Sequence, residues 1–250
     1  MQRLAFGCGP IPTRRKNYFE QHTALEISET YTSLMSGDAL HAWRKEAGTA
    51  FTMILVAHRY LTFDPDDALV DGPLGHASSE HGFLRPTDAN KALWEKVDAQ
   101  ARAVHANMVQ LRTPATFTPT RQNLANLETF RKEIIGEVPY KICWEARGLW
   151  DEEETAELGA SLDMLITSDP YVPFTFEPAP EGDAFYTLKQ PRGRRNFDRE
   201  DIIELVDYFQ DHPGDVTAIF RGGERERNAY AFAAEVRRRY GDLYGPFDAP

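Results

Sequence analysis

The sequence predicts a single domain, residues 1–250, folded as a (β/α)8 barrel of the TIM type with long loops after its third and sixth strands. Short β-like runs alternate with charged, helix-like segments, and such alternation is typical of a parallel sheet. Eight such units in 250 residues match the usual size of a closed barrel. An open, doubly wound sheet is the alternative, because alternation does not show whether the sheet closes.

Eight runs rich in aliphatic, β-branched and aromatic residues predict the strands, because such residues suit a buried, pleated strand. They are Arg3–Cys8, Ala24–Ser28, Phe51–His58, His105–Leu111, Tyr140–Glu145, Leu162–Thr167, Ala184–Gln190 and Val216–Arg221. Charged segments with apolar residues at helical spacing predict helices between them, and Thr120 is the candidate N-cap of one. These segments are Ala39–Ala47, Thr87–Ala103, Thr120–Ile135, Asp151–Gly159, Arg199–Phe209 and Glu224–Tyr240.

Two long connections interrupt this alternation of predicted strands and helices. Phe63–Pro86, after the third strand, contains several glycines together with His76 and His81. Asp169–Asp183, after the sixth strand, is rich in proline and aromatic residues and has no helical period. Long loops in compact domains are lids, binding loops or disordered segments, and the sequence leaves these interpretations open.

The charge and composition exclude some classes of function. A net charge of −11 argues against general coating of nucleic acid or anionic lipid, although a local basic pocket remains compatible with it. Two cysteines are too few for a disulfide framework, so we expect a cytoplasmic protein. No apolar run approaches the roughly 18 residues of a membrane span, and we expect no membrane partner. The sequence assigns neither a cofactor nor an oligomeric state.

Three carboxylates fall at predicted strand ends, the edge at which barrel enzymes place their active sites. Glu26 and Ser28 alternate with apolar residues that should face the helices, so both should face the barrel interior, as should Glu145. Asp169 lies just past the sixth strand, and Arg147 is a ready partner for these carboxylates. The set is an acid/base or metal-binding cluster, a buried ion-pair network that fixes the barrel layers, or a group that is peripheral to the chemistry, and the sequence leaves these alternatives open.

Basic and glycine residues follow the last two predicted strands. They are Lys189, Arg192, Arg194 and Arg195, and the run Arg221, Gly222 and Gly223. Barrels often bind phosphate with these two loops and a helix N-terminus, so we predict that Lys189, Arg192, Arg221, Gly222 and Gly223 hold an anion. The alternative is a solvated loop, and the negative charge of Glu224 at the helix start counts against the anion.

Histidines and cysteines carry weaker signals. His58 ends the third strand and joins Ser28 as a candidate substrate-binding residue. No histidine or carboxylate spacing typical of a metal site occurs, so we assign no metal. Cys8 and Cys143 are expected to be buried apolar side chains and not nucleophiles.

Several segments occur in a fixed order along the chain: Leu25-Glu-Ile-Ser-Glu-Thr-Tyr, Gln110-Leu-Arg-Thr-Pro-Ala-Thr-Phe and Glu145-Ala-Arg-Gly-Leu-Trp. Together they resemble motifs of the YecE-like family, a group of (β/α)8-barrel proteins catalogued as a domain of unknown function. The second is similar to that family's Gln-Leu-Pro-Pro-x-Phe and the third to its Glu-Phe-Arg-His-x-Trp. The resemblance runs from the first strand to the last helix and implies a barrel.

The chain also departs from that family at polar positions. Val56 stands where the resemblance implies Lys, Phe63 and Gly148 stand where it implies His, and Arg221 stands where it implies Asn. In the motif Tyr-x-Arg-x-His-Gly the last three named positions are Leu188, Gln190 and Pro191. The chain therefore resembles a divergent member.

We predict a hydrolase that acts on a phosphate-bearing compound, a sugar phosphate or a nucleic-acid end, at the C-terminal face of the barrel. Glu145 or Glu26 would serve as base, Arg147 would stabilise charge and Asp169 would support them. The alternative is a catalytically degenerate barrel that binds a ligand or a protein partner, which the replaced polar positions favour. Whether the chain is an enzyme stays open at this stage.

Overall fold

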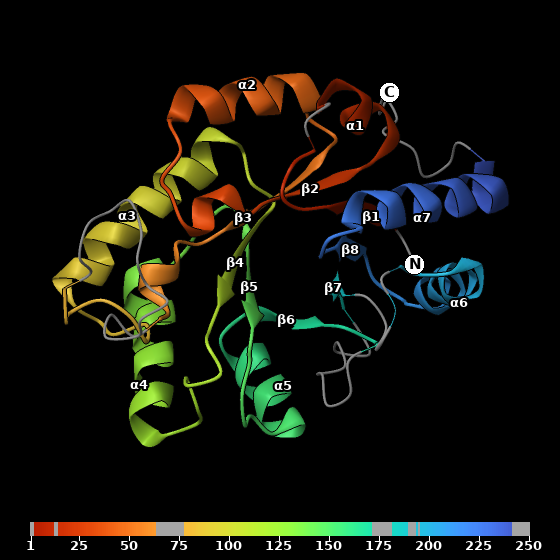
Figure 1. Ribbon diagram of the computed structural model, residues 1–250. Coiled ribbons are helices and arrows are strands. Elements are labelled where there is room, and N and C mark those ends of the chain that lie inside the picture. Colours follow the sequence, from red (N-terminus) through yellow and green to blue (C-terminus); the bar gives the residue numbers. More distant parts are fainter. Residues whose placement is uncertain are drawn as a thin grey trace. The chain divides into compact units, whose positions relative to one another are not determined.

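The computed structural model describes residues 3–12, 15–63, 78–171, 182–189, 194 and 196–241. Eight parallel strands close into a barrel in the order β1 to β8 (Figure 1). They are β1 (Leu4–Cys8), β2 (Ala24–Ile27), β3 (Thr52–Val56), β4 (Met108–Arg112), β5 (Lys141–Glu145), β6 (Met164–Ser168), β7 (Ala184–Leu188) and β8 (Val216–Phe220). The predicted closed barrel is confirmed, and the open sheet is excluded.

The helices that connect the strands follow the predicted segments, with one addition. They are α1 (Arg15–Gln21), α2 (Gly37–Ala47), α3 (Asp88–Ala103), α4 (Arg121–Thr129), α5 (Glu152–Ser161), α6 (Arg199–Gln210) and α7 (Arg225–Tyr240). Thr120 caps α4 as predicted, since its side chain accepts a hydrogen bond from the backbone N–H of Asn123. The helix α1 was not predicted, because seven residues with two buried side chains show no clear apolar period. No described helix is long and apolar enough to cross a lipid bilayer.

Internal contacts divide the chain into two compact units. The first unit comprises residues 1–27, 44–53 and 167–250, and the second comprises residues 28–43 and 54–166. The prediction of a single domain stays a prediction. The predicted long loops contain residues 64–77, which include His76, and residues 172–181. Both ranges lie outside the described residues, so the lid interpretation of these loops also stays a prediction.

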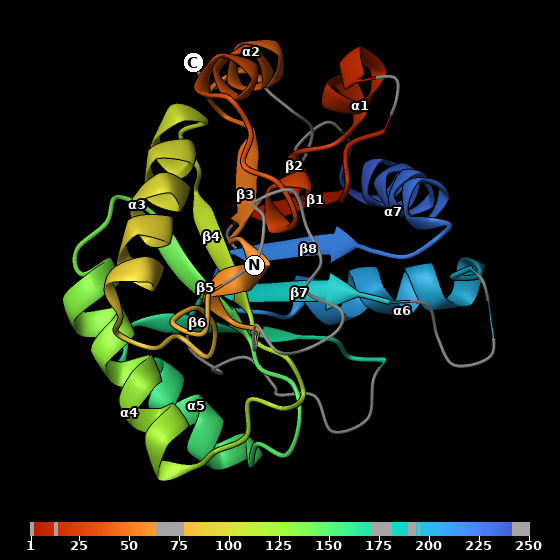
Figure 2. The same cartoon turned by 60° about the vertical axis from the view of Figure 1, so that its left-hand side comes forward.

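In the first unit, β1 pairs with both β2 and β8, and α6 and α7 pack side by side (Figure 2). Tyr18 of α1 ties β1 to β2: its hydroxyl accepts from the backbone N–H of Cys8 at 2.7 Å and donates to the carbonyl of Ala24 at 2.6 Å. A Cβ at Gly7 would lie 1.9 Å from that carbonyl and 2.3 Å from the hydroxyl. Glycine therefore allows α1 to dock against the strands.

In the second unit, β4 lies between β3 and β5. Trp144 of β5 donates its indole N–H to Thr113 and meets Trp150 edge-to-face at 4.8 Å. Gly148, between these two tryptophans, has a φ of +98°, and a Cβ there would lie 2.5 Å from the carbonyl oxygen of Ala115. The loop after β5 therefore packs against the backbone after β4 only with glycine at this position.

The hydroxyl of Tyr18 offers a direct test of the α1 contact. Tyr18→Phe removes the hydroxyl that bridges Cys8 and Ala24, and it takes the acceptor from the buried N–H of Cys8. We expect a loss of about 1–3 kcal/mol in the free energy of unfolding, measured by urea denaturation. Tyr208→Phe, at an exposed tyrosine of α6 whose hydroxyl makes only a long 3.5 Å contact with that of Tyr186, is the control and should cost less than about 1 kcal/mol. Equal stability of both variants would contradict the bridging role.

His22 predicts a dependence of stability on pH. Its ring is fully buried against Tyr18, and burial lowers the pKa of His22 to about 4. The unfolded chain binds a proton near pH 6.5 and the folded chain does not, so stability should fall as the pH drops from about 6.5 to about 4. The loss is on the order of 3 kcal/mol. Denaturant unfolding over this range should show a flatter profile for His22→Asn, and an unchanged slope would contradict the assignment.

Candidate functional site

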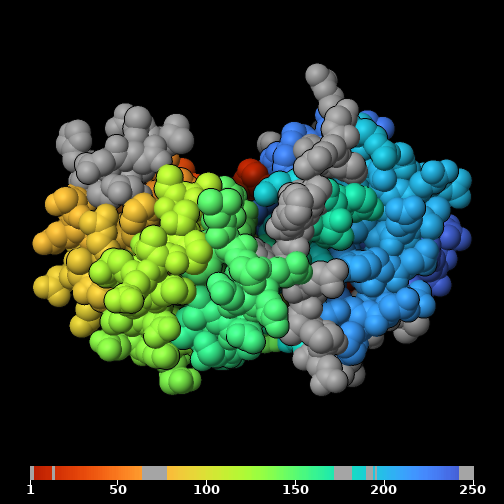
Figure 3. Space-filling model, turned by 90° about the horizontal axis from the view of Figure 1, so that it is seen from below, coloured from red at the N-terminus to blue at the C-terminus, as the bar shows by residue number. Residues whose placement is uncertain are grey.

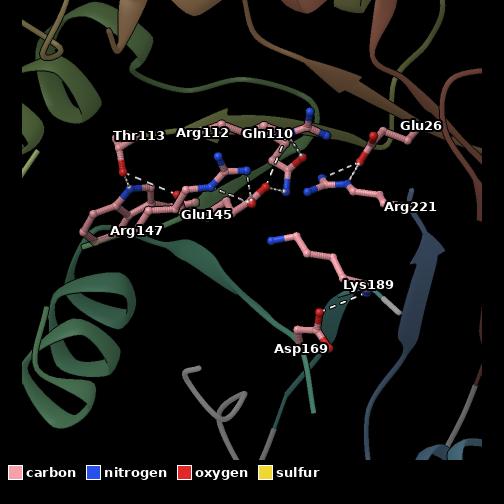
Figure 4. Close-up of polar contacts among 10 residues, drawn as sticks. Glu26, Gln110, Arg112, Thr113, Glu145, Arg147, Asp169, Lys189 and Arg221 are labelled. Carbon is pink, nitrogen blue, oxygen red and sulfur yellow. Dashed lines mark hydrogen bonds and ion pairs between the residues drawn. The ribbon is translucent and has the colours of Figure 1, made fainter. Parts of the chain in front are cut away.

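The candidate residues of the first unit lie at the carboxyl ends of β2, β6, β7 and β8 (Figure 4). Glu26 on β2 is 1% exposed and pairs with Arg221, the residue that follows β8. Arg221 donates from Nε at 2.9 Å and from Nη2 at 2.5 Å to the same oxygen, Oε2 of Glu26. Both partners are buried, so each charge depends on the other for its compensation.

Gly9, just after β1, makes room for this pair. A Cβ at Gly9 would lie 2.7 Å from the Cβ and 2.9 Å from Oε1 of Glu26. Glycine at this position therefore allows the end of β1 to lie close over the Glu26 carboxylate.

Asp169 follows β6 and is 3% exposed. Its carboxylate accepts from the backbone N–H of Lys189 at 3.0 Å and from that of Tyr171 at 3.1 Å. Burial raises the pKa of Asp169, and the two N–H groups and the charges of Lys189 and Arg221 only partly oppose this shift. Burial therefore favours the protonated form of the Asp169 carboxyl.

The basic residues predicted to bind an anion after β7 have different surroundings in the structure. Lys189 is exposed, and Figure 4 shows its side chain extending away from the Asp169 carboxylate. Arg194 forms ion pairs with Asp198 and Asp201 at the start of α6, so acidic neighbours already contact its charge. Arg192 and Arg195 lie outside the described residues, as do Gln190 and Pro191.

The turn between β8 and α7 contains Gly222 and Gly223. Gly222 has a φ of +95°, and a Cβ at Gly223 would meet nothing within 4 Å. The side chain of Arg225 donates to the carbonyl oxygens of Gly222 at 3.3 Å and Pro10 at 3.4 Å. Glu224 precedes α7 and makes no capping hydrogen bond through its side chain. The predicted anion contact at this turn stays a prediction.

The second unit has its own polar cluster, centred on Glu145 at the end of β5 (Figure 4). Arg147 donates to Oε1 of Glu145 from Nε at 3.0 Å and from Nη2 at 2.6 Å, so the partner that the sequence suggested is observed. Arg112 lies 3.3 Å from Oε2 of the same carboxylate. Gln110 donates to Oε2 at 3.4 Å and accepts from Nε of Arg112 at 3.1 Å.

Sequence reasoning missed Gln110 and Arg112 as parts of this cluster. The strand register pairs Gln110 with Cys143 and Arg112 with Glu145, which brings the two polar side chains of β4 to the carboxylate. The alternation of Gln110, Leu111 and Arg112 was a usable signal, because it sends both polar residues to one side of the strand.

Two further candidates, Ser28 and His58, fall in short turns of the second unit. Ser28 begins a 3₁₀ turn, Glu29–Tyr31, and its carbonyl accepts from the N–H of Tyr31. His58 is buried and accepts from the N–H of Tyr60 at 3.2 Å. Burial lowers the pKa of His58 to about 4, so the ring is neutral near pH 7.

The two cysteines lie in the interior. Cys8 and Cys143 are fully buried, and burial raises the pKa of Cys8 to about 12 and that of Cys143 still further. A thiolate nucleophile is therefore disfavoured at both. Within the described ranges, no group of three or more His, Cys, Asp or Glu residues is placed to hold a metal ion.

A groove of about 440 Å³ in the second unit lies against α4 and α5, whose side chains neighbour each other in Figure 3. Its walls are Pro119, Leu124, Trp150, Glu154, Glu157, Leu158 and Ser161. The groove contains two carboxylates and no basic side chain among these residues, so its chemistry does not suit an anion.

Neither a protein-family profile nor a curated protein matches the sequence. The fold is similar to that of solved structures. A DUF72 family protein from Enterococcus faecalis V583 matches with a TM-score of 0.70 and 13% identity, covering 96% of this chain and 98% of that one. A DUF72 family protein from Thermotoga maritima MSB8 matches with a TM-score of 0.65 and 14% identity, over 94% and 99% of the two chains.

A third solved structure, SacUVDE, matches with a TM-score of 0.60 and 8% identity, covering 96% of this chain and 99% of that one. At these identities the similarity is one of fold. The neighbours are therefore barrels of the same architecture, and the chemistry has to be argued from the residues of this chain.

The Glu26–Arg221 pair predicts a large stability effect. Glu26→Gln removes the carboxylate charge that contacts the buried guanidinium of Arg221, so we expect a loss of about 3–5 kcal/mol in thermal or denaturant unfolding. Glu128→Gln, at a half-exposed carboxylate 3.9 Å from Lys132, is the control and should cost less than about 1 kcal/mol. Combining Glu26→Gln with Arg221→Met should recover most of the loss. A single variant as stable as the parent would contradict the pairing.

Proposed function

We propose that the protein is a divergent relative of the DUF72 proteins and a hydrolase of a phosphate-bearing compound. The reaction is assigned to the strand ends of the first unit. The observation that carries the proposal is Asp169, a buried carboxyl with a raised pKa within electrostatic range of two cations, Lys189 and Arg221. A carboxyl able to give a proton, beside cations that stabilise negative charge, is the combination that hydrolysis of a phosphate ester uses.

Each residue of the first unit then has one role. Lys189, exposed after β7, contacts the phosphate, and the Gly222–Gly223 turn lets backbone N–H groups approach it. Glu26 holds Arg221 in place, so that the guanidinium adds a fixed positive charge. Arg192 keeps its proposed contact with the phosphate, although it lies outside the described residues.

Water is the second substrate of the proposed reaction. Asp169 gives its proton to the leaving oxygen as the phosphorus–oxygen bond breaks, and water supplies the oxygen that replaces it. The Asp169 carboxylate then takes a proton from the added water and returns to its acid form. Such transfers depend mainly on positioning and on stabilising charge, which suits a site with fixed cations. The predicted roles of Glu145 as base and Arg147 as charge stabiliser concern the second unit and are not needed for this step.

A binding protein without catalysis is the second candidate, and a specific observation favours it. Val56 and Leu188, which stand where the resemblance implies Lys and Arg, are fully buried apolar side chains. A barrel that has replaced these cations has lost two groups able to contact a phosphate. This protein would bind a ligand or partner without turning it over.

Substitutions at Asp169 and Lys189 separate the two candidates. We expect a panel of sugar phosphates, nucleotides and short single-stranded DNA to contain a ligand that raises the melting temperature by about 5–10 °C at a hundred times its Kd. Asp169→Asn should lower kcat for its hydrolysis by about 100-fold or more while the ligand still binds. In the parent, kcat should fall as the pH rises through the raised pKa of Asp169, because the acid loses its proton.

Lys189→Ala should weaken binding of the same ligand, and Lys45→Ala, at an exposed lysine of α2, is the matched control. Binding without hydrolysis by the parent would favour the binding protein. Neither binding nor hydrolysis of any phosphate compound would contradict the proposal.

A further inference from the structure

Positive charge is concentrated around Tyr31 in the second unit. Burial raises the pKa of the Tyr31 hydroxyl, and among the charges that act on it the strongest is Arg147, followed by Arg112, Glu145 and Arg59. Three guanidinium groups and one carboxylate thus dominate the field at this hydroxyl. In a chain of net charge −11, such a local excess of arginine is unexpected for a solvated face.

The side chains concerned are linked by direct contacts. The guanidinium carbon of Arg112 lies 5.5 Å from the centre of the Tyr31 ring, and its Nε lies 3.3 Å from Glu145. Arg147 meets the other oxygen of Glu145 at 2.6 Å. Glu145 therefore shares its charge between two arginines and orients both of them, while Arg112 keeps the Tyr31 ring in place by a cation–π contact.

Two donors of this cluster remain available to a ligand. Arg147 uses Nε and Nη2 for Glu145, which leaves Nη1 without a contact in the described part of the chain, and its side chain is 42% exposed. The hydroxyl of Tyr31 likewise makes no hydrogen bond to any described residue, and the residue is half-buried. Because the pKa of Tyr31 is raised, its hydroxyl keeps its proton and can donate it.

We propose that the second unit carries a binding site for a small oxyanion, held by Nη1 of Arg147 and the hydroxyl of Tyr31 and neutralised by Arg112 and Arg59. An oxyanion accepts hydrogen bonds from both donors, whereas a cation would be repelled by three guanidinium groups against the single carboxylate of Glu145. Phosphate and carboxylate share this chemistry. The site lies within the second unit, and it does not rest on the hydrolase proposed for the first.

Titration with inorganic phosphate tests the site, using calorimetry on the full chain at low ionic strength. Arg147→Gln should weaken phosphate binding by about tenfold or more, and Tyr31→Phe should weaken it by about three- to tenfold. Arg147→Lys keeps the charge and loses the forked geometry, so its affinity should fall between those of Arg147→Gln and the parent. Arg102→Gln, at an exposed arginine of α3 that is paired with Asp98, is the control and should bind like the parent.

Tyr31→Phe keeps the ring on Arg112, so it tests the hydroxyl even if Arg147→Gln fails to fold. Parent-like phosphate affinity in folded Tyr31→Phe and Arg147→Gln, checked by circular dichroism, would overturn the proposal. Loss of all phosphate binding in Lys189→Ala alone would also overturn it and would leave the hydrolase standing. Loss in the Arg147 and Tyr31 variants alone would support it and would count against the phosphate contact of the first unit. Acetate in place of phosphate shows which oxyanion the site prefers.

Discussion

The buried ion pair between Glu26 and Arg221 is the interaction on which the first unit depends. The two residues are 195 positions apart in the chain, and their contact joins the end of β2 to the residue that leaves β8. Two charges this deeply buried are tolerated only when each compensates the other. The glycine at position 9 lets the chain after β1 lie close to Glu26, and the Tyr18 hydroxyl bridges β1 and β2. The charge of Arg221 also acts on Asp169, where it partly opposes the burial that raises the pKa of that carboxyl.

Most of the barrel could be predicted from sequence because its signals are local. The strand β7 begins at Ala184 as predicted and ends two residues early, and β1 begins one residue late. Caps such as Thr120 are local as well, since a side chain and a backbone N–H three residues away suffice. The helix α1 was not predicted because it is fixed mainly by the Tyr18 hydroxyl, which bonds to β1 and β2. A contact of this kind leaves no periodic pattern in the sequence.

The candidate sites were only partly predictable, and the reason is register. Arg147 was paired with Glu145 in advance because the two lie two residues apart in the chain. Arg112 and Tyr31 reach the same cluster from other elements, and only the pairing of β4 with β5 and the turn after β2 bring them there. Arg221 was predicted to hold an anion. That stays a prediction. In the structure its guanidinium donates to the buried carboxylate of Glu26, a contact that its position in the sequence did not indicate.

Gly148 limits which side chains the loop after β5 can accept. Its backbone has a positive φ and lies against the carbonyl oxygen of Ala115. The histidine that the resemblance implies at this position would meet both a steric clash and a backbone that L side chains rarely adopt. A single substitution to histidine is therefore incompatible with this loop as it stands, and accepting it requires the neighbouring backbone to change as well.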